Sequence, residues 1–265
     1  MKAWESPLGR RDPSMKLAVV VVLSLLLVLV IDPLTPLLFL ALTLAAAFAL
    51  GRVGPVGYAR ALGALAIVGL GFVWSNAILA TVPTDTPPLA VWGPVRVTEP
   101  GLRFGVAIAL RGLAIGALSL TFVLTTDPTR FAVSLSRNLH VPDRIAYPLL
   151  AAYRFLPFLA DEYAQIHLAQ RVRGGGDRAF LAGLRSRLRE IVPLFASGIR
   201  RASLVAISMD ARAFAGATRR THLREVPIGR ADVAFAAVAI AAALGLLWLS
   251  ASLGWLRLWD GRFSA

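Results

Sequence analysis

The chain has 265 residues, of which 57% are hydrophobic and only 16% are charged, and its formal net charge is +13. Soluble domains usually carry about 25% charged residues, so this composition excludes a disordered chain and disfavours a soluble enzyme. The sequence contains no cysteine, which excludes disulfides, cysteine-ligated zinc and cysteine nucleophiles. We therefore interpret the chain as a small polytopic membrane protein.

Five apolar runs predict transmembrane helices, because a helix needs about 20 apolar residues to cross a bilayer. The predicted spans cover about residues 15–31, 33–51, 61–84, 104–126 and 233–256. The first run is short, and we expect Lys16 to extend it by placing its ammonium group at the bilayer surface. Asp32 and Pro33 separate the first two runs, and because proline disfavours helix in the residue before it, we expect these spans to form a hairpin.

Arg111 is the single charged residue within the fourth run. An intramembrane arginine is a functional candidate by default. The uncharged runs contain no acidic residue that could pair with it. We therefore expect Arg111 to reach the bilayer surface or to face backbone carbonyls rather than to mark a transport site.

Six glycines in the third and fourth spans predict that these helices allow a close approach, because glycine has no side chain to hold a neighbour away. They are Gly63, Gly69, Gly71, Gly105, Gly112 and Gly116. The neighbour is either the other of the two spans or a partner membrane protein.

Arginine placement predicts the orientation in the membrane. Residues 130–230 contain 17 arginines and 7 acidic residues, which is most of the excess positive charge. Because so long a region counts less in the positive-inside rule, the inference rests on two short basic segments, one before the first span and one between the second and third. The positive-inside rule places these three regions in the cytoplasm. With five spans, we expect the N-terminus inside and the C-terminus outside.

The predicted fold is an all-α polytopic membrane protein with about five transmembrane helices. Residues 1–126 are predicted to form a transmembrane domain. Residues 127–230 are predicted to form a cytoplasmic domain of amphipathic helices between spans four and five. Residues 231–265 are predicted to hold the last transmembrane helix and a tail outside the cytoplasm.

Within the cytoplasmic domain, residues 145–160 are apolar but contain Pro148, Arg154 and Pro157. Because proline interrupts a helix, we expect separate helices along the membrane surface rather than a span. Residues 161–172 have a helix-forming composition, and the glycine run that follows predicts a helix end. Around residues 199–214, apolar side chains recur at spacings of three and four, which predicts an amphipathic helix of about four turns.

Two arginine motifs lie near the predicted helix ends. The first contains Ala169, Gln170, Arg171, Arg173 and Gly174, and the second contains Asp210, Ala211 and Arg212. An arginine at a helix C-terminus interacts with the helix dipole by about 0.3–1 kcal/mol. An arginine that protrudes from a helix end can instead enter a groove on a partner protein and pair bidentately with a carboxylate. The residues alone support both interpretations equally.

Several segments in their order resemble the EcfT family, the transmembrane T component of energy-coupling factor transporters, which includes the cobalt-transport protein CbiQ. The segments are residues 12–17, 125–128, 141–142, 153–157, 169–174, 210–214 and 220–221. They are similar to the family patterns D-P-R-T-K-L, T-T-x-P, l-P, l-R-F-i-P, A-Q-x-A-R-G, A-R-G and R-T. The departures are Val172 for alanine and Ala213 for glycine. Because alanine disfavours positive φ, we expect the second helix to continue to Gly216.

This resemblance implies a coupling subunit of an ATP-driven importer for a vitamin or a transition-metal ion. It implies that Arg173 and Arg212 end coupling helices that dock on two cytoplasmic ABC-type ATPases. A small membrane S component would bind the substrate, and the chain itself would need no cofactor. The partners would bind ATP, since neither lysine of this chain, Lys2 or Lys16, follows a glycine and a Walker A lysine is therefore absent.

Two alternatives lie outside this family. A secondary transporter is disfavoured because the spans show neither intramembrane acids nor an inverted repeat. A membrane-anchored nucleic-acid-binding protein would use the basic residues of 130–230 to follow phosphates. It is disfavoured because that region alternates with apolar faces and has few aromatic residues for stacking. The predicted partners are therefore the ATPases, the S component and the lipid bilayer, and not nucleic acid.

Overall fold

The chain forms two structural units, and its path passes from the first to the second and back. Unit 1 consists of Met1–Ser134 and Val226–Ala265, and unit 2 consists of Leu135–Glu225. The computed structural model describes residues 5–79, 88–92, 95–139, 141–172, 180–213 and 228–255. The cytoplasmic location of residues 127–230 stays a prediction.

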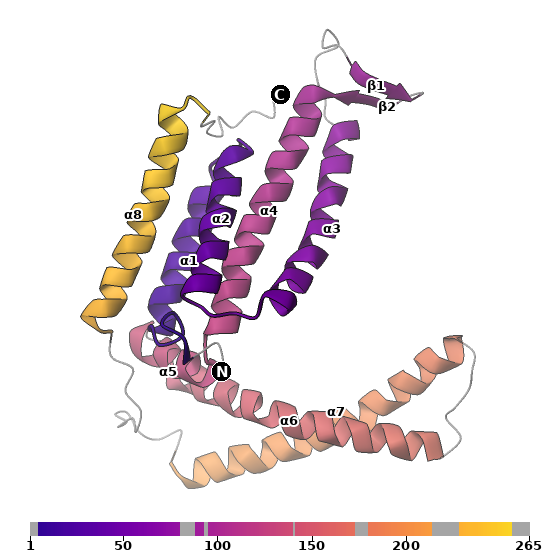
Figure 1. Ribbon diagram of the computed structural model, residues 1–265. Coiled ribbons are helices and arrows are strands. Elements are labelled where there is room, and N and C mark those ends of the chain that lie inside the picture. Colours follow the sequence, from indigo (N-terminus) through magenta and orange to yellow (C-terminus); the bar gives the residue numbers. More distant parts are fainter. Residues whose placement is uncertain are drawn as a thin grey trace. The chain divides into compact units, whose positions relative to one another are not determined.

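Five helices run side by side in unit 1 (Figure 1). They are α1 (Pro13–Val28), α2 (Leu34–Ala49), α3 (Pro55–Leu79), α4 (Glu99–Thr125) and α8 (Arg230–Ser252). A short helix, α5 (Pro128–Asn138), follows α4. The all-α polytopic fold is confirmed. The helices α1, α3, α4 and α8 begin two to six residues before the predicted runs, and all five helices end before those runs do.

A two-stranded antiparallel sheet joins α3 and α4, which was not expected from the sequence. It consists of β1 (Pro88–Trp92) and β2 (Val95–Thr98). A hairpin of this length lies within the proline-rich stretch that separates the third and fourth predicted spans. The strands therefore lie in the connection between α3 and α4 and not within a helix of unit 1.

Among the described residues, four helical segments are long and apolar enough to cross a membrane. They are Pro55–Ile78, Glu99–Thr125, Leu188–Ala211 and Arg230–Ser252. The helices α1 and α2 are apolar but shorter, at 16 residues each. The segment Leu188–Ala211 belongs to the region that the sequence analysis placed in the cytoplasm, and that placement stays a prediction.

The core of unit 1 forms around α4, which packs against α1, α2 and α3, while α8 packs against α1 and α2. One buried cluster combines Val19, Leu23 and Leu27 of α1 with Phe39 of α2, Ala114 and Leu118 of α4 and Ala243 of α8. The exposed large side chains of unit 1 are also apolar, including Ile67 and Leu70 on α3. An apolar exterior of this kind suits a lipid environment, in which packing rather than hydrophobicity selects the inward face.

The predicted close approach occurs between α3 and α4. A Cβ atom added to Gly105 would lie 2.9 Å from the Cα atom of Val73, so only glycine fits at that position. Gly69 faces Ala109 across the same contact, at 3.4 Å from an added Cβ to the alanine Cβ. Gly63 and Gly112 face open space instead. Gly69 and Gly105 therefore lie at the contact between α3 and α4, whereas Gly63 and Gly112 do not contact a neighbouring helix.

Arg111 has partners that the sequence analysis did not find. Its Nη2 atom donates a hydrogen bond to the backbone carbonyl of Val30, which confirms the expected carbonyl contact. The Asp32 carboxylate, which lies between the first two uncharged runs and not within them, also interacts electrostatically with the guanidinium. Asp32 lies in the turn between α1 and α2, and the helix hairpin brings this turn beside the middle of α4.

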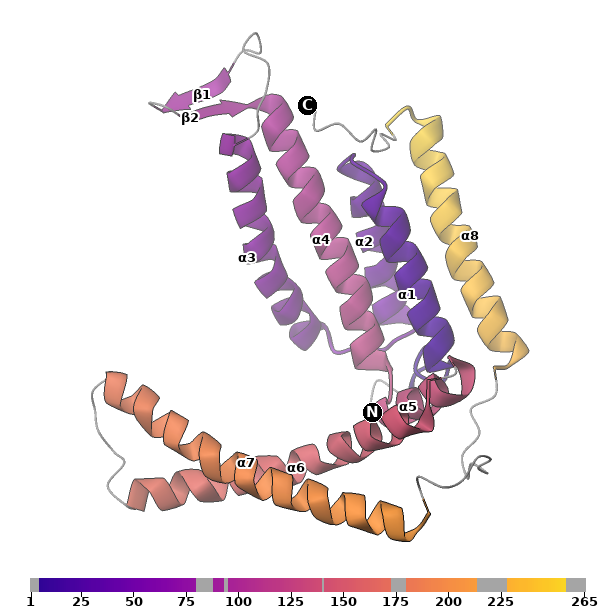
Figure 2. The same cartoon turned by 180° about the vertical axis from the view of Figure 1, so that it is seen from behind.

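Unit 2 is built on two long helices, α6 (Asp143–Val172) and α7 (Phe180–Ala211). They are 30 and 32 residues long and cross each other in an antiparallel sense (Figure 2). The expected interruption of residues 145–160 was wrong, because α6 continues through Pro148 and Pro157. Both prolines lie on the exposed side of α6, so the packed face of the helix is not interrupted.

Candidate partner-docking site

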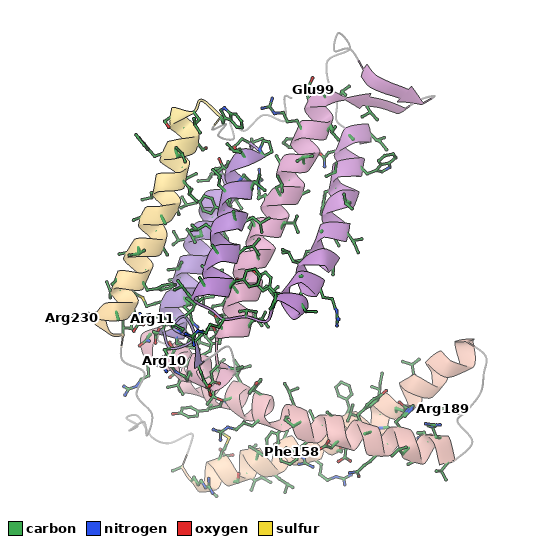
Figure 3. The ribbon with its side chains drawn as sticks, viewed as in Figure 1. Arg10, Arg11, Glu99, Phe158, Arg189 and Arg230 are labelled. Carbon is green, nitrogen blue, oxygen red and sulfur yellow. The ribbon has the colours of Figure 1, made fainter. Side chains whose placement is uncertain are left out.

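Side chains on facing surfaces hold α6 and α7 together. The Cδ2 atom of Leu159 lies 3.8 Å from the position of a Cβ on Gly198, so the two helices are in contact there. The guanidinium of Arg201 lies 5.6 Å from the ring centroid of Phe158, a cation–π contact. Figure 3 shows Phe158 on α6 where the two helices cross. Unit 2 is therefore a packed pair of helices rather than two independent surface helices.

A buried acidic residue adds a polar contact to this pair. Glu190 of α7 is 2% exposed, and its Oε1 atom lies 2.9 Å from Nδ1 of His167 on α6. An ionised carboxylate only accepts hydrogen bonds, so the His167 tautomer with a proton on Nδ1 is the one that donates to it. The His167 ring also stacks on Tyr163, with centroids 6.2 Å apart. Nothing in the sequence distinguished Glu190 from the other acids of the region, because its burial arises only from the helix crossing.

The first arginine motif lies at the end of α6. Ala169, Gln170 and Arg171 belong to the last turn of the helix, and Ala169 and Arg171 are exposed. Val172 is 89% exposed, so the replacement of alanine by valine meets no neighbour in the described part of the chain. Arg173 and Gly174 lie outside the described residues. The predicted helix end at this motif agrees with the last residue of α6.

The second arginine motif follows the end of α7 directly. Asp210 and Ala211 are the last exposed residues of the helix, and Arg212 lies exposed in the turn that follows. The backbone N–H of Arg212 donates to the carbonyl of Met209 at 3.1 Å, and that of Ala213 donates to the carbonyl of Asp210 at 2.9 Å. These bonds end the helix tightly and leave the Arg212 side chain at its tip.

The expectation that this helix continues to Gly216 was wrong. Ala213 has a φ of 54°, the left-handed conformation that commonly ends helices. A residue with a side chain costs about 1–2 kcal/mol in this conformation, and glycine does not. The glycine of the family pattern therefore matches the backbone that the alanine adopts here. The hydrogen bonds that the Arg212 and Ala213 N–H groups donate at the helix end offset this conformational cost.

The two motifs lie at opposite ends of the helix pair. The chain runs from the crossing point at Leu159 to Arg171 in one direction and from Gly198 to Arg212 in the other. At a rise of 1.5 Å per residue, Arg171 and Arg212 are up to about 40 Å apart. The unit therefore presents two separate arginine-bearing tips and does not gather them into one basic site.

No group of acidic and histidine residues suited to a metal ion occurs among the described residues. The chemistry available at the two tips is therefore that of exposed guanidinium groups, which bind carboxylates or phosphates through paired hydrogen bonds.

The match to a protein family decides between the interpretations of the chain as a whole. A family model, CbiQ, described as "Cobalt transport protein", matches residues 5–223. The chain belongs to the CbiQ family. The resemblance to EcfT and CbiQ is confirmed, and with it the assignment as a membrane protein of a transport family.

Three relatives illustrate the breadth of the CbiQ match. A "Putative ABC transporter ATP-binding protein" of Bifidobacterium longum is 32% identical over 248 residues, which are 89% of this chain and 31% of that protein. An "Energy-coupling factor transporter transmembrane protein EcfT" of Leuconostoc gelidum is 34% identical over 166 residues, 58% of this chain and 61% of that one. A protein of the same name from Brevibacillus brevis is 28% identical over 254 residues, 92% of this chain and 94% of that one. The match thus spans less than two thirds of the first two relatives and nearly the whole of the third.

Proposed function

We propose that this chain is the transmembrane coupling subunit of an energy-coupling factor importer for a vitamin or a transition-metal ion. It transmits conformational changes of two cytoplasmic ABC-type ATPases to a membrane S component that binds the substrate. The observation that carries the proposal is the exposed Arg212 at the tip of a 32-residue helix in a CbiQ-family chain. The relatives named as transmembrane proteins of energy-coupling factor transporters support it.

Docking on the ATPases uses the arginines of the two motifs. Arg173 and Arg212 each enter a groove on one ATPase subunit and pair with a carboxylate there, because a guanidinium fork matches a carboxylate in two hydrogen bonds. Ala169, Gln170, Arg171 and Gly174 line the first contact, and Asp210 and Ala211 line the second. A separation of up to about 40 Å between the tips suits two subunits better than one groove. The Bifidobacterium relative supports an ATPase partner, since it carries a segment similar to this chain within a protein named for ATP binding.

The chain contributes no catalytic site or cofactor to the importer. Its two lysines, Lys2 and Lys16, do not follow glycine, so it lacks the lysine of a phosphate-binding loop. ATP is bound and hydrolysed by the partner subunits. The purified chain alone is therefore expected to show no nucleotide binding and no ATP hydrolysis, and robust binding by the isolated chain would contradict the assignment.

The orientation in the cell membrane follows from charge. Arg10, Arg11 and Arg230 lie at the end of unit 1 where α1 and α8 begin, and Glu99 lies at the opposite end (Figure 3). The positive-inside rule places the basic end, the N-terminus and residues 127–230 in the cytoplasm, and residue 265 outside. A reporter that is active only outside the cytoplasm should therefore work when it is fused after Ala265. Strong activity of a cytoplasmic reporter there would reverse this topology.

The central experiment is co-purification with the two ATPases, followed by ATP-driven uptake in proteoliposomes that also hold the S component. The double variant Arg173→Ala/Arg212→Ala should lose both the ATPases and the uptake, while it still inserts into the membrane. Arg200→Ala, an exposed arginine within the same helix, α7, is the matched control and should retain both. Full capture and full uptake by the double variant would show that the motifs are ordinary helix ends.

A further inference from the structure

A cluster of buried polar side chains lies in unit 1 where α1 and α8 begin. We call Asp12, Ser14, Lys16, Ser134 and Asp232 the junction cluster. Each of these five residues is at most 9% exposed, and Ser134 is fully buried. Burying charges and hydroxyl groups is costly unless they bind one another, so the contacts within the cluster determine whether it is stable.

Asp12 is the centre of the junction cluster. Its Oδ1 atom accepts hydrogen bonds from the backbone N–H groups of Ser14 at 2.8 Å and Met15 at 3.2 Å, which caps the start of α1. The hydroxyl of Ser14 also donates to Oδ1. Ser134 of α5 donates its hydroxyl to both carboxylate oxygens, at 3.2 and 3.3 Å, and accepts from the Ser14 N–H at 3.2 Å. One carboxylate thus holds α5 against the beginning of α1.

Asp232 ties α8 to the same point. The backbone N–H of Asp12 donates to Oδ1 of Asp232 at 3.1 Å. The N–H of Gly229 donates to Oδ2 at 3.0 Å, so the same carboxylate also caps the start of α8. The two helix starts are therefore joined through residues that are 220 positions apart in the chain.

Lys16 brings α4 into the junction cluster. Its ammonium group donates to the carbonyl of Thr125, the last residue of α4, at 3.0 Å. It also interacts electrostatically with both Asp12 and Asp232. The buried positive charge offsets the two buried carboxylates and satisfies a carbonyl at the helix end, which would otherwise lack a partner.

The place of the cluster along the chain suggests its role. The chain enters unit 2 directly after Ser134 and returns at Val226. The first helix after the return is α8, and Asp232 lies in its first turn. The cluster therefore joins residues near both connections to unit 2, Ser134 before it and Asp232 after it, to α1 and α4.

We propose that Asp12, Ser134 and Asp232 are positioning residues that transmit displacement of unit 2 to α1, α4 and α8. The role rests on the proposed function, in which the ATPases move unit 2. Hinges absorb motion where a few residues are free to change φ and ψ, and fixed connections pass it on instead. A cluster that only stabilised the bundle would affect its stability but not its response to nucleotide.

The experiment uses the full chain with its ATPases bound, in nanodiscs. The chain has no native cysteine, so Ser252→Cys at the exposed end of α8 provides a single reactive thiol. The rate of its modification by a water-soluble maleimide is compared between a non-hydrolysable ATP analogue and ADP. Coupling of ordinary allosteric size should change this rate by about fivefold or more.

Ser134→Ala removes the hydroxyl that binds Asp12, and we expect the ratio of the two rates to fall to near one while ATPase capture is retained. Asp232→Asn, which keeps the side-chain volume, should have the same effect if Ser134→Ala does not fold. Tyr58→Phe is the control. It removes a buried hydroxyl that joins α3 to α4 by a 2.9 Å bond to the carbonyl of Ala117, away from both connections. This control should keep the full ratio.

Three results would overturn the positioning role. The first is a nucleotide effect in Ser134→Ala and Asp232→Asn that equals that of the parent chain. The second is loss of the effect in Tyr58→Phe as well. The third is the absence of any nucleotide effect in the parent chain. Failure of the parent chain to capture ATPases at all is a different result. It would contradict the proposed function itself, and the positioning role would fall with it.

Discussion

The size of the free-energy change on replacing Arg212 distinguishes the docking hypothesis from simple helix capping. In the free chain, Arg212 is exposed directly after the last residue of α7, where a capping role would rest on contacts with the helix dipole and free carbonyls. Such contacts contribute about 0.3–1 kcal/mol. The change Arg212→Ala should therefore lower the free energy of unfolding of the chain by about 1 kcal/mol at most.

In the complex, the same change removes one partner of a desolvated charge pair. Truncation of such a pair costs about 2–5 kcal/mol, much of it from the carboxylate left without a partner. At 1.4 kcal/mol per tenfold change, the dissociation constant for the ATPases should rise by about 30-fold to about 4,000-fold. Arg212→Lys should lie between the parent and alanine, because lysine keeps the charge but lacks the planar fork.

The assay measures the dissociation constant of the purified ATPase pair for the chain in nanodiscs, beside thermal unfolding of the chain alone. Arg200→Ala on the same helix is the control and should change neither quantity by more than a few tenths of a kcal/mol. If Arg212→Ala raises the dissociation constant by less than about fivefold, which is about 1 kcal/mol, the arginine is a helix cap and not a docking residue.

Three further changes test the fold around the site. Ala213→Gly should stabilise the end of α7 by about 0.5–1 kcal/mol in thermal unfolding. Glycine removes the left-handed strain at φ 54°, and its greater loss of backbone entropy offsets part of that gain. Unchanged or lower stability would contradict the strained turn. His167→Ala should destabilise unit 2 by about 1–3 kcal/mol and speed its proteolysis, because Glu190 is left buried without its donor, and equal protease resistance would count against this contact. Gly105→Ala should lower the free energy of unfolding by about 1–3 kcal/mol, because the added methyl group forces α3 away from α4. Gly112 faces open space, so Gly112→Ala should be nearly neutral. Similar melting temperatures for the two variants would show that the close approach is not required.

The sequence by itself determined that the five apolar runs become helices and that the chain is a membrane protein. The apolar runs predicted α3, α4 and α8 because their length and composition are local properties that a bilayer selects directly. The end of α6 at the first arginine motif was also predictable, since a glycine run follows it. The family patterns around both motifs identified the candidate docking residues, and their roles stay predictions.

The tertiary structure decided the features that depend on packing between distant parts of the chain. Pro148 and Pro157 suggested breaks, but α6 is continuous through both prolines, and both are exposed on its surface. The electrostatic contact of Arg111 with Asp32 arises because the α1–α2 turn lies beside α4. The bonds from Asp12 to Ser134 and Asp232 join residues more than a hundred positions apart. No local pattern encodes such pairs, because a polar side chain becomes buried and bonded only when separate helices meet.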